Sequence, residues 1–538
     1  MKTVIVGGVA GGMSAATRLR RLDEKADIVV FERSGYVSFA NCGLPYHLGG
    51  VIEQRSALLL QTPASLRSRF NLDVRVRHEV LSIDTAARTV RVRALDTGEE
   101  FDESYDSLVL SPGAKPFVPP IPGAERALPL RNIEDTDAMA AQLGALAPGA
   151  AAVIMGAGFI GIELAENLVH RGFAVTVVEL ADQVLAPLDP ELAALVASRL
   201  GQQGVQVLTG VSVTAIGADS VTLSDGSTQP AALVVAAIGV RPESGLAQAA
   251  GLAVDGRGGI VVDEHQRTSD PAIFAVGDAA VKVDALTGEG TLVPLASPAN
   301  RHGRLVADVI AGRPVSALPV LGTAVLGAFG LTAAVTGWNE KRARAAGRPI
   351  RVIHTHPANH AGYYPGAEGM SLKLVIDAQT DAILGAQGVG GAGVDKRIDV
   401  IATAMRGGIT ASDLADLELA YAPQFGSAKD PVNMLGYVAS NLRDGDVENI
   451  QWHELAAEVA KGVQLIDVRT AAEYAKGTIE GAINIPVDDL RERLDEVQPG
   501  AIVHCQVGLR GYIAARLLNQ FGKNVRNLDG GYRTWARF

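Results

Sequence analysis

Two segments in which a short apolar strand runs into a glycine-rich turn constrain this chain most. The first opens at Val4-Ile5-Val6-Gly7 and the second at Val153-Ile154-Met155-Gly156. Each is followed by an apolar strand that ends in an acid, Glu32 in the first segment and Glu179 in the second. In this strand–helix–strand arrangement the helix N-terminus faces a pyrophosphate and the acid faces a ribose hydroxyl. The sequence therefore predicts an α/β protein with two nucleotide sites.

The second turn matches the dinucleotide-binding pattern in full. Gly156, Gly158 and Gly161 occupy the three glycine positions of G-x-G-x-x-G, and a helix is expected over Ile162 to His170. Glu179 would accept a hydrogen bond from a ribose 2′-hydroxyl and repel a 2′-phosphate, and no arginine follows it directly. This turn predicts NADH as the ligand, with NADPH as the alternative.

The first turn, Gly7 to Gly12, departs from the pattern because Val9 stands at the middle glycine position. Its cofactor is indicated by the segment from Thr268 to Asp278, which resembles the second FAD fingerprint of the pyridine-nucleotide-disulfide oxidoreductases. The resemblance extends over about the first 440 residues. It implies FAD held by Gly7, Gly12 and Glu32, with Asp278 on the ribityl chain.

The resemblance also implies the domain organisation. We expect two Rossmann-like nucleotide-binding domains, an α+β dimerisation domain with a helix over Asp395 to Met405, and a C-terminal α/β domain after a polar linker. The expected ranges are 1–115 with 250–320 for FAD, 116–249 for NAD(P)H, 321–440 for dimerisation, 441–450 for the linker and 451–538 for the last domain.

The chain has only two cysteines, which excludes a disulfide framework and suits a reducing compartment. Cys42 lies in Ser38-Phe39-Ala40-Asn41-Cys42-Gly43-Leu44-Pro45-Tyr46, which resembles the single-cysteine branch: coenzyme A disulfide reductases, persulfide reductases and their NADH oxidase and peroxidase relatives. His47 stands where glutathione-reductase-like enzymes have a second cysteine. Electrons must therefore pass to an adduct on Cys42, either a mixed disulfide, a persulfide or a sulfenic acid. Glu163 is a candidate for positioning the nicotinamide.

Coenzyme A, as substrate or tightly bound ligand, would need cations and hydrogen-bonding groups. Arg18 and Arg21 lie three apart on the first helix, on one face with Ser14. The resemblance implies that the residues contacting coenzyme A are Ser14, Arg18, Arg21, Ser38, Asn41 and Lys429. It also implies that Tyr363 and Tyr421 reach across a dimer, where their hydroxyls would protonate the thiolate leaving the Cys42 adduct.

The C-terminal segment resembles a rhodanese domain. The matching pieces are Asp467-Val468-Arg469, Glu473-Tyr474, Gly477 to Pro486 and His504 to Gly511. The run from Cys505 to Arg510 is expected to form a loop whose amides point at the sulfur, with a helix over Tyr512 to Phe521 adding its positive end. Four residues between Cys505 and Arg510 favour sulfur transfer over phosphatase activity. Thr478 departs from the histidine common at that position.

Charge and hydropathy narrow the partners. A formal net charge of −11 argues against nucleic acid and anionic membranes. The apolar run Ala324 to Trp338 is too short to span a bilayer, and no secretory signal opens the chain, so a cytoplasmic protein is expected. His354, His356 and His360 have no acid or cysteine beside them that completes a ligand set, and no metal site is predicted.

The fusion of the two halves favours one activity. We expect NADH- and FAD-dependent reduction of CoA persulfide, other persulfides, polysulfide and CoA disulfide by a homodimer, coupled to a sulfur-transferring rhodanese domain. Two alternatives stay open: an NADH oxidase or peroxidase acting through a Cys42 sulfenic acid, and a sulfur-trafficking protein that delivers persulfide from Cys505 to partner proteins.

Overall fold

The computed structural model describes residues 1–537, which form two compact units. One unit comprises Met1–Asp182 and Gln203–Gly322, and the other comprises Gln183–Gln202 and the described residues from Thr323 onward. The chain therefore leaves the first unit for a short segment, returns to it, and then completes the second. Within the described residues, none of the helices combines the length and the apolar character that crossing a membrane requires.

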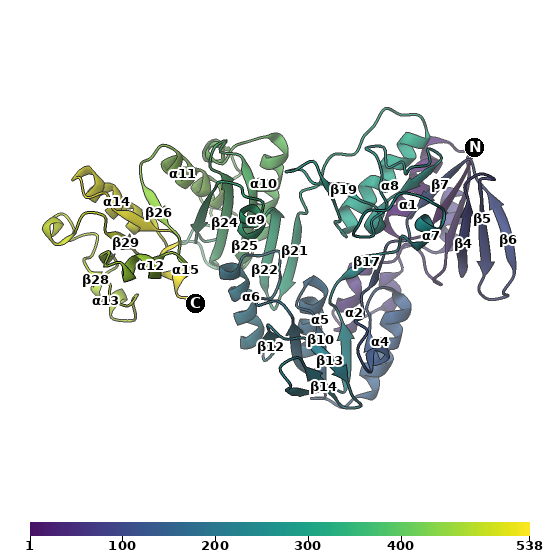
Figure 1. The fold of residues 1–538 in the computed structure, drawn as a ribbon, viewed down its shortest axis with the longest axis horizontal. Coiled ribbons are helices and arrows are strands. Elements are labelled where there is room, and N and C mark those ends of the chain that lie inside the picture. Colours follow the sequence, from purple (N-terminus) through teal and green to yellow (C-terminus); the bar gives the residue numbers. More distant parts are fainter. Residues whose placement is uncertain (538) are drawn as a thin grey trace. The chain divides into compact units, whose positions relative to one another are not determined.

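A parallel five-stranded sheet in the order β18-β7-β1-β2-β3 organises the N-terminal part of the first unit. Helices α1 and α8 lie side by side on one face of it (Figure 1). A three-stranded antiparallel sheet, β4-β5-β6, packs on the other face. The bounds are β1 (Lys2–Val6), α1 (Ala10–Leu22), β2 (Asp27–Glu32), η1 (Asn41–Gly43), α2 (Leu44–Leu48), α3 (Pro63–Phe70), β3 (Asp73–Val76), β4 (His78–Asp84), β5 (Thr89–Ala94), β6 (Glu100–Ser104), β7 (Ser107–Leu110), α7 (Gly245–Ala249), β18 (Ile273–Ala275), η4 (Gly277–Ala279), β19 (Lys282–Val283), β20 (Gly290–Thr291) and α8 (Ala296–Ile310).

A second parallel sheet of the same unit follows the order β12-β11-β10-β16-β9. An antiparallel sheet, β13-β14-β15, closes one side of its core, and the antiparallel pair β8 and β17 connects it to the first sheet along the chain. The bounds are β8 (Ala114–Pro116), β9 (Ala127–Leu128), α4 (Ile133–Ala145), β10 (Ala151–Met155), α5 (Phe159–His170), β11 (Ala174–Glu179), β12 (Gln206–Thr209), β13 (Val213–Ile216), β14 (Ser220–Leu223), β15 (Thr228–Pro230), β16 (Leu233–Ala236) and β17 (Val240–Pro242).

The second unit begins with an antiparallel sheet in the order β21-β22-β25-β24-β23. Its apolar side chains pack against α10 and α11. The bounds are α6 (Pro190–Gln202), β21 (Ala324–Ala328), β22 (Leu331–Gly337), α9 (Glu340–Ala345), β23 (Ile350–Thr355), β24 (Met370–Asp377), β25 (Ile383–Gly390), α10 (Val394–Gly407) and α11 (Pro431–Arg443). The apolar run 324–338 is thus a hairpin of β21 and β22.

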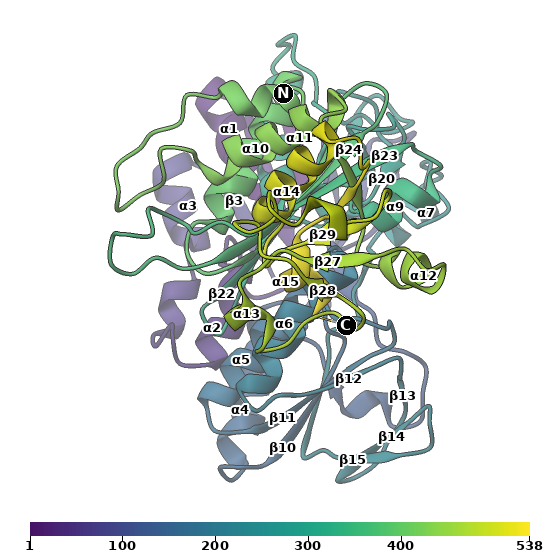
Figure 2. The ribbon, with the colours of Figure 1, turned by 90° about the vertical axis from the view of Figure 1, so that its left-hand side faces the viewer.

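The C-terminal part of the second unit is a parallel sheet in the order β26-β30-β29-β27-β28. Figure 2 labels three of its strands, β27, β28 and β29. The bounds are β26 (Glu448–Ile450), α12 (Leu455–Ala460), β27 (Leu465–Asp467), α13 (Ala471–Tyr474), β28 (Ile483–Asn484), β29 (Ile502–His504), α14 (Leu509–Gln520), β30 (Arg526–Leu528) and α15 (Gly531–Trp535).

Several predicted boundaries differ from the observed ones. Helix α5 begins three residues before Ile162, and α14 begins three residues before Tyr512, because the glycine preceding each helix caps it earlier. The predicted linker 441–450 is shorter than expected: α11 continues through Arg443, and β26 begins at Glu448. Leu442 still packs on the core and extends the helix.

Candidate active site

The first glycine turn is held by close backbone contacts. Gly7 has a φ of +101°, and a Cβ there would overlap the carbonyl oxygen of Ser111. A Cβ on Gly12 would in turn overlap the carbonyl oxygen of Gly7. The Gly8 amide donates to Oε2 of Glu32 over 2.8 Å. These contacts require glycine at both ends of the turn and fix the acid beside it.

The second turn repeats this geometry. Gly156 has a φ of +104°, and a Cβ on Gly161 would overlap the Gly156 carbonyl oxygen. The Ala157 amide donates to Oε2 of Glu179 over 2.8 Å. By contrast, a Cβ on Gly158 would meet open space, so the fold itself does not require glycine there.

Val9 takes the place of the middle glycine in the first turn without strain. As the N-cap of α1 it has a φ of −108°, which any residue adopts. No side chain caps the first amides of α1 at Val9, nor those of α5 at Gly158. Both long helices therefore present their first amides to a ligand, as a pyrophosphate requires. The residues fit two nucleotides.

Asp278 lies in η4, directly after β18, where it is half-buried. Burial raises the pKa of its carboxyl, and the nearby Lys282 and Arg131 oppose that rise. The buried Lys282 ammonium donates to the carbonyls of Gly277 and Ala280 and so holds the turn on both sides of Asp278. A half-buried carboxylate of this kind fits a hydroxyl-bearing ligand such as the ribityl chain of FAD.

Cys42 lies exposed in the short helix η1, in the same unit as both glycine turns. Burial by its surroundings, together with the charges of Glu163 and Asp278, raises the pKa of its thiol. The same interactions place Cys42 within electrostatic reach of both nucleotide sites.

The flanks of Cys42 are tightly fixed. Ser38 takes a left-handed φ of +48°, and the Asn41 side chain donates to the Arg131 carbonyl over 3.0 Å. His47, which replaces a second cysteine, has its Nδ1 2.7 Å from the Ile52 carbonyl oxygen. The structure therefore gives Cys42 no thiol partner among the described residues.

The predicted cations of α1 are placed differently from one another. Arg18 forms an ion pair of 2.7 Å with Asp308 of α8 and is largely buried. Ser14 donates to Asn300 over 2.6 Å, and Arg21 is exposed. Of the two arginines, Arg21 is the one whose side chain faces solvent.

Tyr363 and Tyr421 lie together in the second unit. Their hydroxyl oxygens are 3.0 Å apart, and the two residues are 76% and 48% exposed. The hydrogen bond with Tyr421 raises the pKa of Tyr363. Lys429 is exposed on the segment that follows. The pair thus presents two phenols to solvent.

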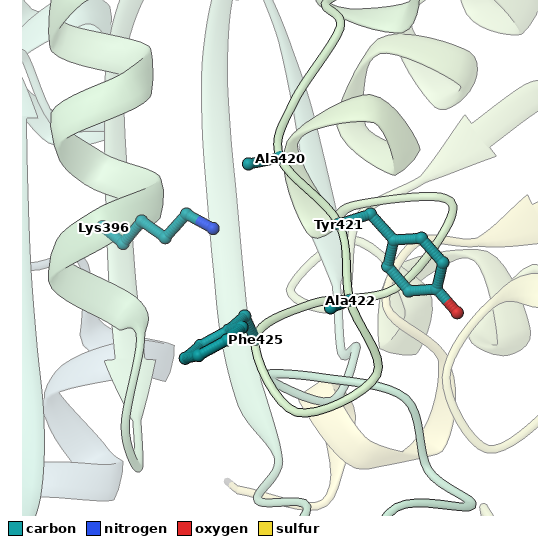
Figure 3. Close-up of a pocket in the computed structure, with 5 residues that line it drawn as sticks. All are labelled: Lys396, Ala420, Tyr421, Ala422 and Phe425. Carbon is teal, nitrogen blue, oxygen red and sulfur yellow. The ribbon is translucent and has the colours of Figure 1, made fainter.

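A pocket of about 320 Å³ lies beside Tyr421 and is lined by Lys396, Ala420, Tyr421, Ala422 and Phe425 (Figure 3). The Lys396 side chain extends from α10 toward the loop that carries Phe425, whereas the Tyr421 ring points away from Lys396. Lys396 was not singled out from the sequence. Its spacing from Tyr421 gives no signal, because only the fold brings α10 beside that loop.

Cys505 lies buried at the end of β29, at the start of the predicted loop. The Gly508 amide donates to Cys505 Sγ over 3.2 Å. Gly508 has a φ of +97° and serves as the N-cap of α14, so the sulfur lies at the amino end of that helix. One backbone amide and the amino end of a helix both favour an anion on the sulfur, such as a thiolate or a persulfide.

Arg510 forms a two-pronged ion pair with Glu473, with distances of 2.8 and 2.6 Å from its two terminal nitrogens. That hydrogen bonding lowers the pKa of Glu473 to about 2. The charge of Cys505 also acts on Arg510. The arginine therefore lies within range of the sulfur while its direction is set by Glu473.

Thr478 has a clear structural role. Its hydroxyl donates to Oδ2 of the buried Asp467 over 2.7 Å. Arg469 binds the same carboxylate with distances of 2.7 to 3.1 Å. The threonine thus satisfies a buried acid beneath the Cys505 loop.

The histidine cluster has acidic partners that the sequence did not reveal. His354 lies between Glu191 at 2.9 Å and Asp529 at 2.6 Å. Three buried acids, Asp189, Glu191 and Glu340, lie close enough together to hold a metal ion. The ammonium of Lys373 lies among them, at 2.9, 2.5 and 2.6 Å respectively, and takes the place of a cation.

The chain matches three family models. Residues 1–303 match the pyridine nucleotide-disulphide oxidoreductase model, 325–431 the dimerisation domain of that family, and 451–538 the rhodanese-like domain. These matches confirm the predicted fold class.

Similar proteins and solved structures agree with these family matches. Coenzyme A disulfide reductase of Staphylococcus aureus is 34% identical over 439 residues, covering 81% of this chain and 99% of that protein. The crystal structure of reduced Bacillus anthracis CoADR-RHD is 48% identical, with a TM-score of 0.98 over 100% of this chain and 98% of that one. A NAD-dependent persulfide reductase from A. fulgidus is 38% identical, with a TM-score of 0.93 over 99% of this chain and 100% of the other.

Proposed function

Because the chain belongs to the pyridine nucleotide-disulphide oxidoreductase family and ends in a rhodanese-like domain, we propose that it is a flavin-dependent sulfur reductase. It uses NADH to reduce CoA persulfide, other persulfides, polysulfide and CoA disulfide at Cys42. The names of its relatives, a coenzyme A disulfide reductase and a persulfide reductase, support these substrates.

One observation carries the proposal. Cys42 has no thiol partner among the described residues, and it feels the charges of Asp278 at the first nucleotide turn and Glu163 on the helix of the second. A lone sulfur between two nucleotide sites suits electron transfer to an external sulfur substrate. An internal disulfide could not serve that role here.

Two cofactors fit the turns. Gly7, Gly12, Glu32 and Asp278 would hold FAD, and the turn of Gly156, Gly158 and Gly161 with Glu179 would hold NADH. When bound, FAD would supply the two-electron chemistry that links NADH to the sulfur. NADH is favoured over NADPH because Glu179 would repel a 2′-phosphate.

Cys42 carries the substrate sulfur. Its thiolate attacks the disulfide or persulfide bond of the substrate, forms a new S–S bond, and releases the first thiolate. Two electrons and one proton then cleave the Cys42 S–S bond, which restores the Cys42 thiolate and frees the second product as thiol or hydrogen sulfide. Tyr363 and Tyr421, reaching across the proposed dimer, would donate the proton to that leaving sulfur.

Recognition of coenzyme A is assigned to polar side chains. The candidates for coenzyme A are Ser14, Arg18, Arg21, Ser38, Asn41 and Lys429. Arg21 and Lys429 are exposed cations suited to phosphates, whereas Arg18 would have to exchange its ion pair with Asp308.

Cys505 is proposed to carry sulfane sulfur as a persulfide. The Gly508 amide and the N-terminus of α14 would stabilise its anion, and Arg510 would add a positive charge. The persulfide would then be exchanged with the thiol of coenzyme A and reduced at Cys42.

The assembly proposed is a homodimer, since residues 325–431 match the family's dimerisation domain. We place it in the cytoplasm, where thiols such as Cys42 and Cys505 stay reduced. We also propose the domain boundaries stated above, with the linker reduced to the residues between α11 and β26.

Steady-state kinetics of Cys42→Ser and Cys505→Ser test the proposal, with CoA persulfide, CoA disulfide, polysulfide and oxygen as separate oxidants. Cys42→Ser should abolish NADH-driven reduction of all three sulfur substrates. Full persulfide turnover in that variant would overturn the mechanism. Fast oxygen consumption without any sulfur substrate would favour an oxidase, and sulfur delivery to partner proteins that survives loss of Cys42 would favour a trafficking role.

A further inference from the structure

A histidine of the dimerisation domain is linked to the C-terminal domain by a carboxylate. His354 of β23 is buried, and both its backbone amide and its Nδ1 face Oδ2 of Asp529, at 3.0 and 2.6 Å. Its Nε2 faces Oε1 of Glu191 at 2.9 Å. With a carboxylate on each ring nitrogen, the imidazole donates from both and is held as a cation.

Asp529 opens the turn that follows β30. Its Oδ1 accepts a hydrogen bond from the Asn449 side chain over 3.1 Å, and its amide donates to the Ile450 carbonyl over 3.0 Å. Gly530 and Gly531 come next, with φ values of +66° and +61°. Two successive left-handed residues make this turn dependent on glycine and on whatever holds Asp529.

The two glycines are confined between His354 and the Cys505 loop. A Cβ on Gly530 would lie 2.8 Å from the His354 Cβ, and one on Gly531 would lie 2.5 Å from the Cys505 carbonyl oxygen. The next amide, that of Tyr532, donates to that same carbonyl over 2.8 Å. The turn therefore contacts the histidine on one side and the cysteine on the other.

The Tyr532 and Arg533 amides set the direction of the loop. They donate to the carbonyls of Cys505 and Gln506 over 2.8 and 2.9 Å, which orients the peptide planes that lead to Gly508. The Gly508 amide donates to Cys505 Sγ over 3.2 Å. A shift of the turn would therefore reach the donor that stabilises the sulfur anion.

We propose that His354 is a positioning residue for Cys505, acting through Asp529 and the Gly530-Gly531 turn. The dimerisation domain thereby orients the loop amide that faces the sulfur carrier. The inference rests on the proposed function only in taking Cys505 as that carrier.

The charges around the histidine support this role. Burial lowers the pKa of His354, but the hydrogen bonds with Asp529 and Glu191 outweigh it and raise the pKa to about 9. The imidazolium is therefore present at neutral pH. The other titratable or charged groups near it are Lys373, Asp189, Glu340, His356, Arg533 and Arg537.

The test titrates Cys505 directly. In the Cys42→Ser chain, Cys505 is the one remaining cysteine, so isotope-labelled cysteine gives a single β-carbon resonance whose shift against pH reports its ionisation. We expect His354→Gln to raise the midpoint of that titration by about one pH unit, since the loop amide no longer points steadily at the sulfur. The parent should also show a second inflection near pH 9, where His354 loses its proton, and His354→Gln should lack it.

His360→Gln is the matched control. His360 is a buried histidine of the same domain whose Nδ1 lies 3.1 Å from the Ala361 carbonyl oxygen, and it should leave the titration unchanged. Coincident curves for the parent and His354→Gln would overturn the proposal. Should His354→Gln fail to fold, the titration curve of the Cys42→Ser parent tests the proposal by itself. A single inflection in that curve would also overturn it. Failure of the proposed function would appear separately, as absent NADH-driven turnover in the chain that retains both cysteines.

Discussion

The phenol of Tyr46 donates a hydrogen bond to Oε1 of Glu163 over 3.0 Å. Tyr46 belongs to α2, directly after Cys42, and Glu163 belongs to α5, which begins at the second glycine turn. The bond therefore links the segment that carries Cys42 to the helix that would face the nicotinamide nucleotide. Glu163 acts on the sulfur as well, because its charge raises the pKa of the Cys42 thiol.

Replacing Glu163 by Gln should make Cys42 more acidic. Removing one of the two carboxylates that act on the sulfur lowers the pKa of the thiol and raises its thiolate fraction at neutral pH. In a Cys505→Ser background, alkylation of Cys42 at pH 7 should become about threefold faster or more. Glu166→Gln is the control, since Glu166 acts on Tyr46 and Glu163. An equal acceleration in both variants would contradict the assignment.

Two glycine variants of the second turn should separate an effect on stability from an effect on NADH binding. Gly161→Ala places a Cβ on the Gly156 carbonyl oxygen, so its free energy of unfolding should fall by about 2 kcal/mol or more. Gly158→Ala meets open space and should change that free energy by less than about 1 kcal/mol. Its effect should appear in NADH affinity, because the added methyl lies where the pyrophosphate approaches. Urea unfolding and NADH titration by fluorescence measure the two effects, and unaltered NADH binding by Gly158→Ala would remove this turn from the site.

Glu473→Gln should impair sulfur transfer from Cys505. The carboxylate orients Arg510 with two hydrogen bonds, and its loss leaves the guanidinium free to leave the Cys505 loop. We expect transfer from thiosulfate to cyanide to slow by about tenfold, the size typical of losing a supporting residue. Glu496→Gln breaks the ion pair with Arg493 in the same domain, with a distance of 2.6 Å, and should have no effect. Equal rates for both variants and the parent would count against a role for Arg510.

The His354 network predicts a loss of stability in alkaline solution. The pKa of His354 is raised from 6.5 to about 9, so its ion pairs stabilise the fold fully below about pH 6.5 and cease to do so as pH rises through 9. The contribution at stake is on the order of 3 kcal/mol. Melting temperatures of the parent should therefore fall between pH 7 and 10 more steeply than those of His354→Gln. Parallel curves would show that His354 does not titrate in this range.

The glycine turns were predictable because their requirements are local. Gly7 and Gly156 need left-handed backbone, and Gly12 and Gly161 need close packing one turn later, so the pattern lies within a few positions of the sequence. The acid of each site, such as Glu32, ends the next strand. The predicted helix starts were less accurate. A helix that begins directly after an N-cap glycine can open with residues that the apolar periodicity does not mark.

The buried ionic network was not predictable, because its partners are far apart in sequence. Lys373 and Glu191 are 182 positions apart, and His354 and Asp529 are 175 apart. A lysine inside the fully buried strand Met370–Asp377 does signal that an acid must lie nearby. It does not say which acid, and the fold alone selects Asp189, Glu191 and Glu340.

The excursion of segment 183–202 out of the first unit also has a consequence for biosynthesis. Helix α6 emerges from the ribosome long before β24 and β25, and its apolar side chains Leu192, Val196 and Leu200 are buried only in the finished second unit. Glu191 likewise has no Lys373 to pair with until 182 more residues have been synthesised. During synthesis the first unit must therefore fold while an amphipathic helix within its sequence is still unpacked. A chain released early would expose the apolar face of that helix, which chaperones would bind or which would promote aggregation.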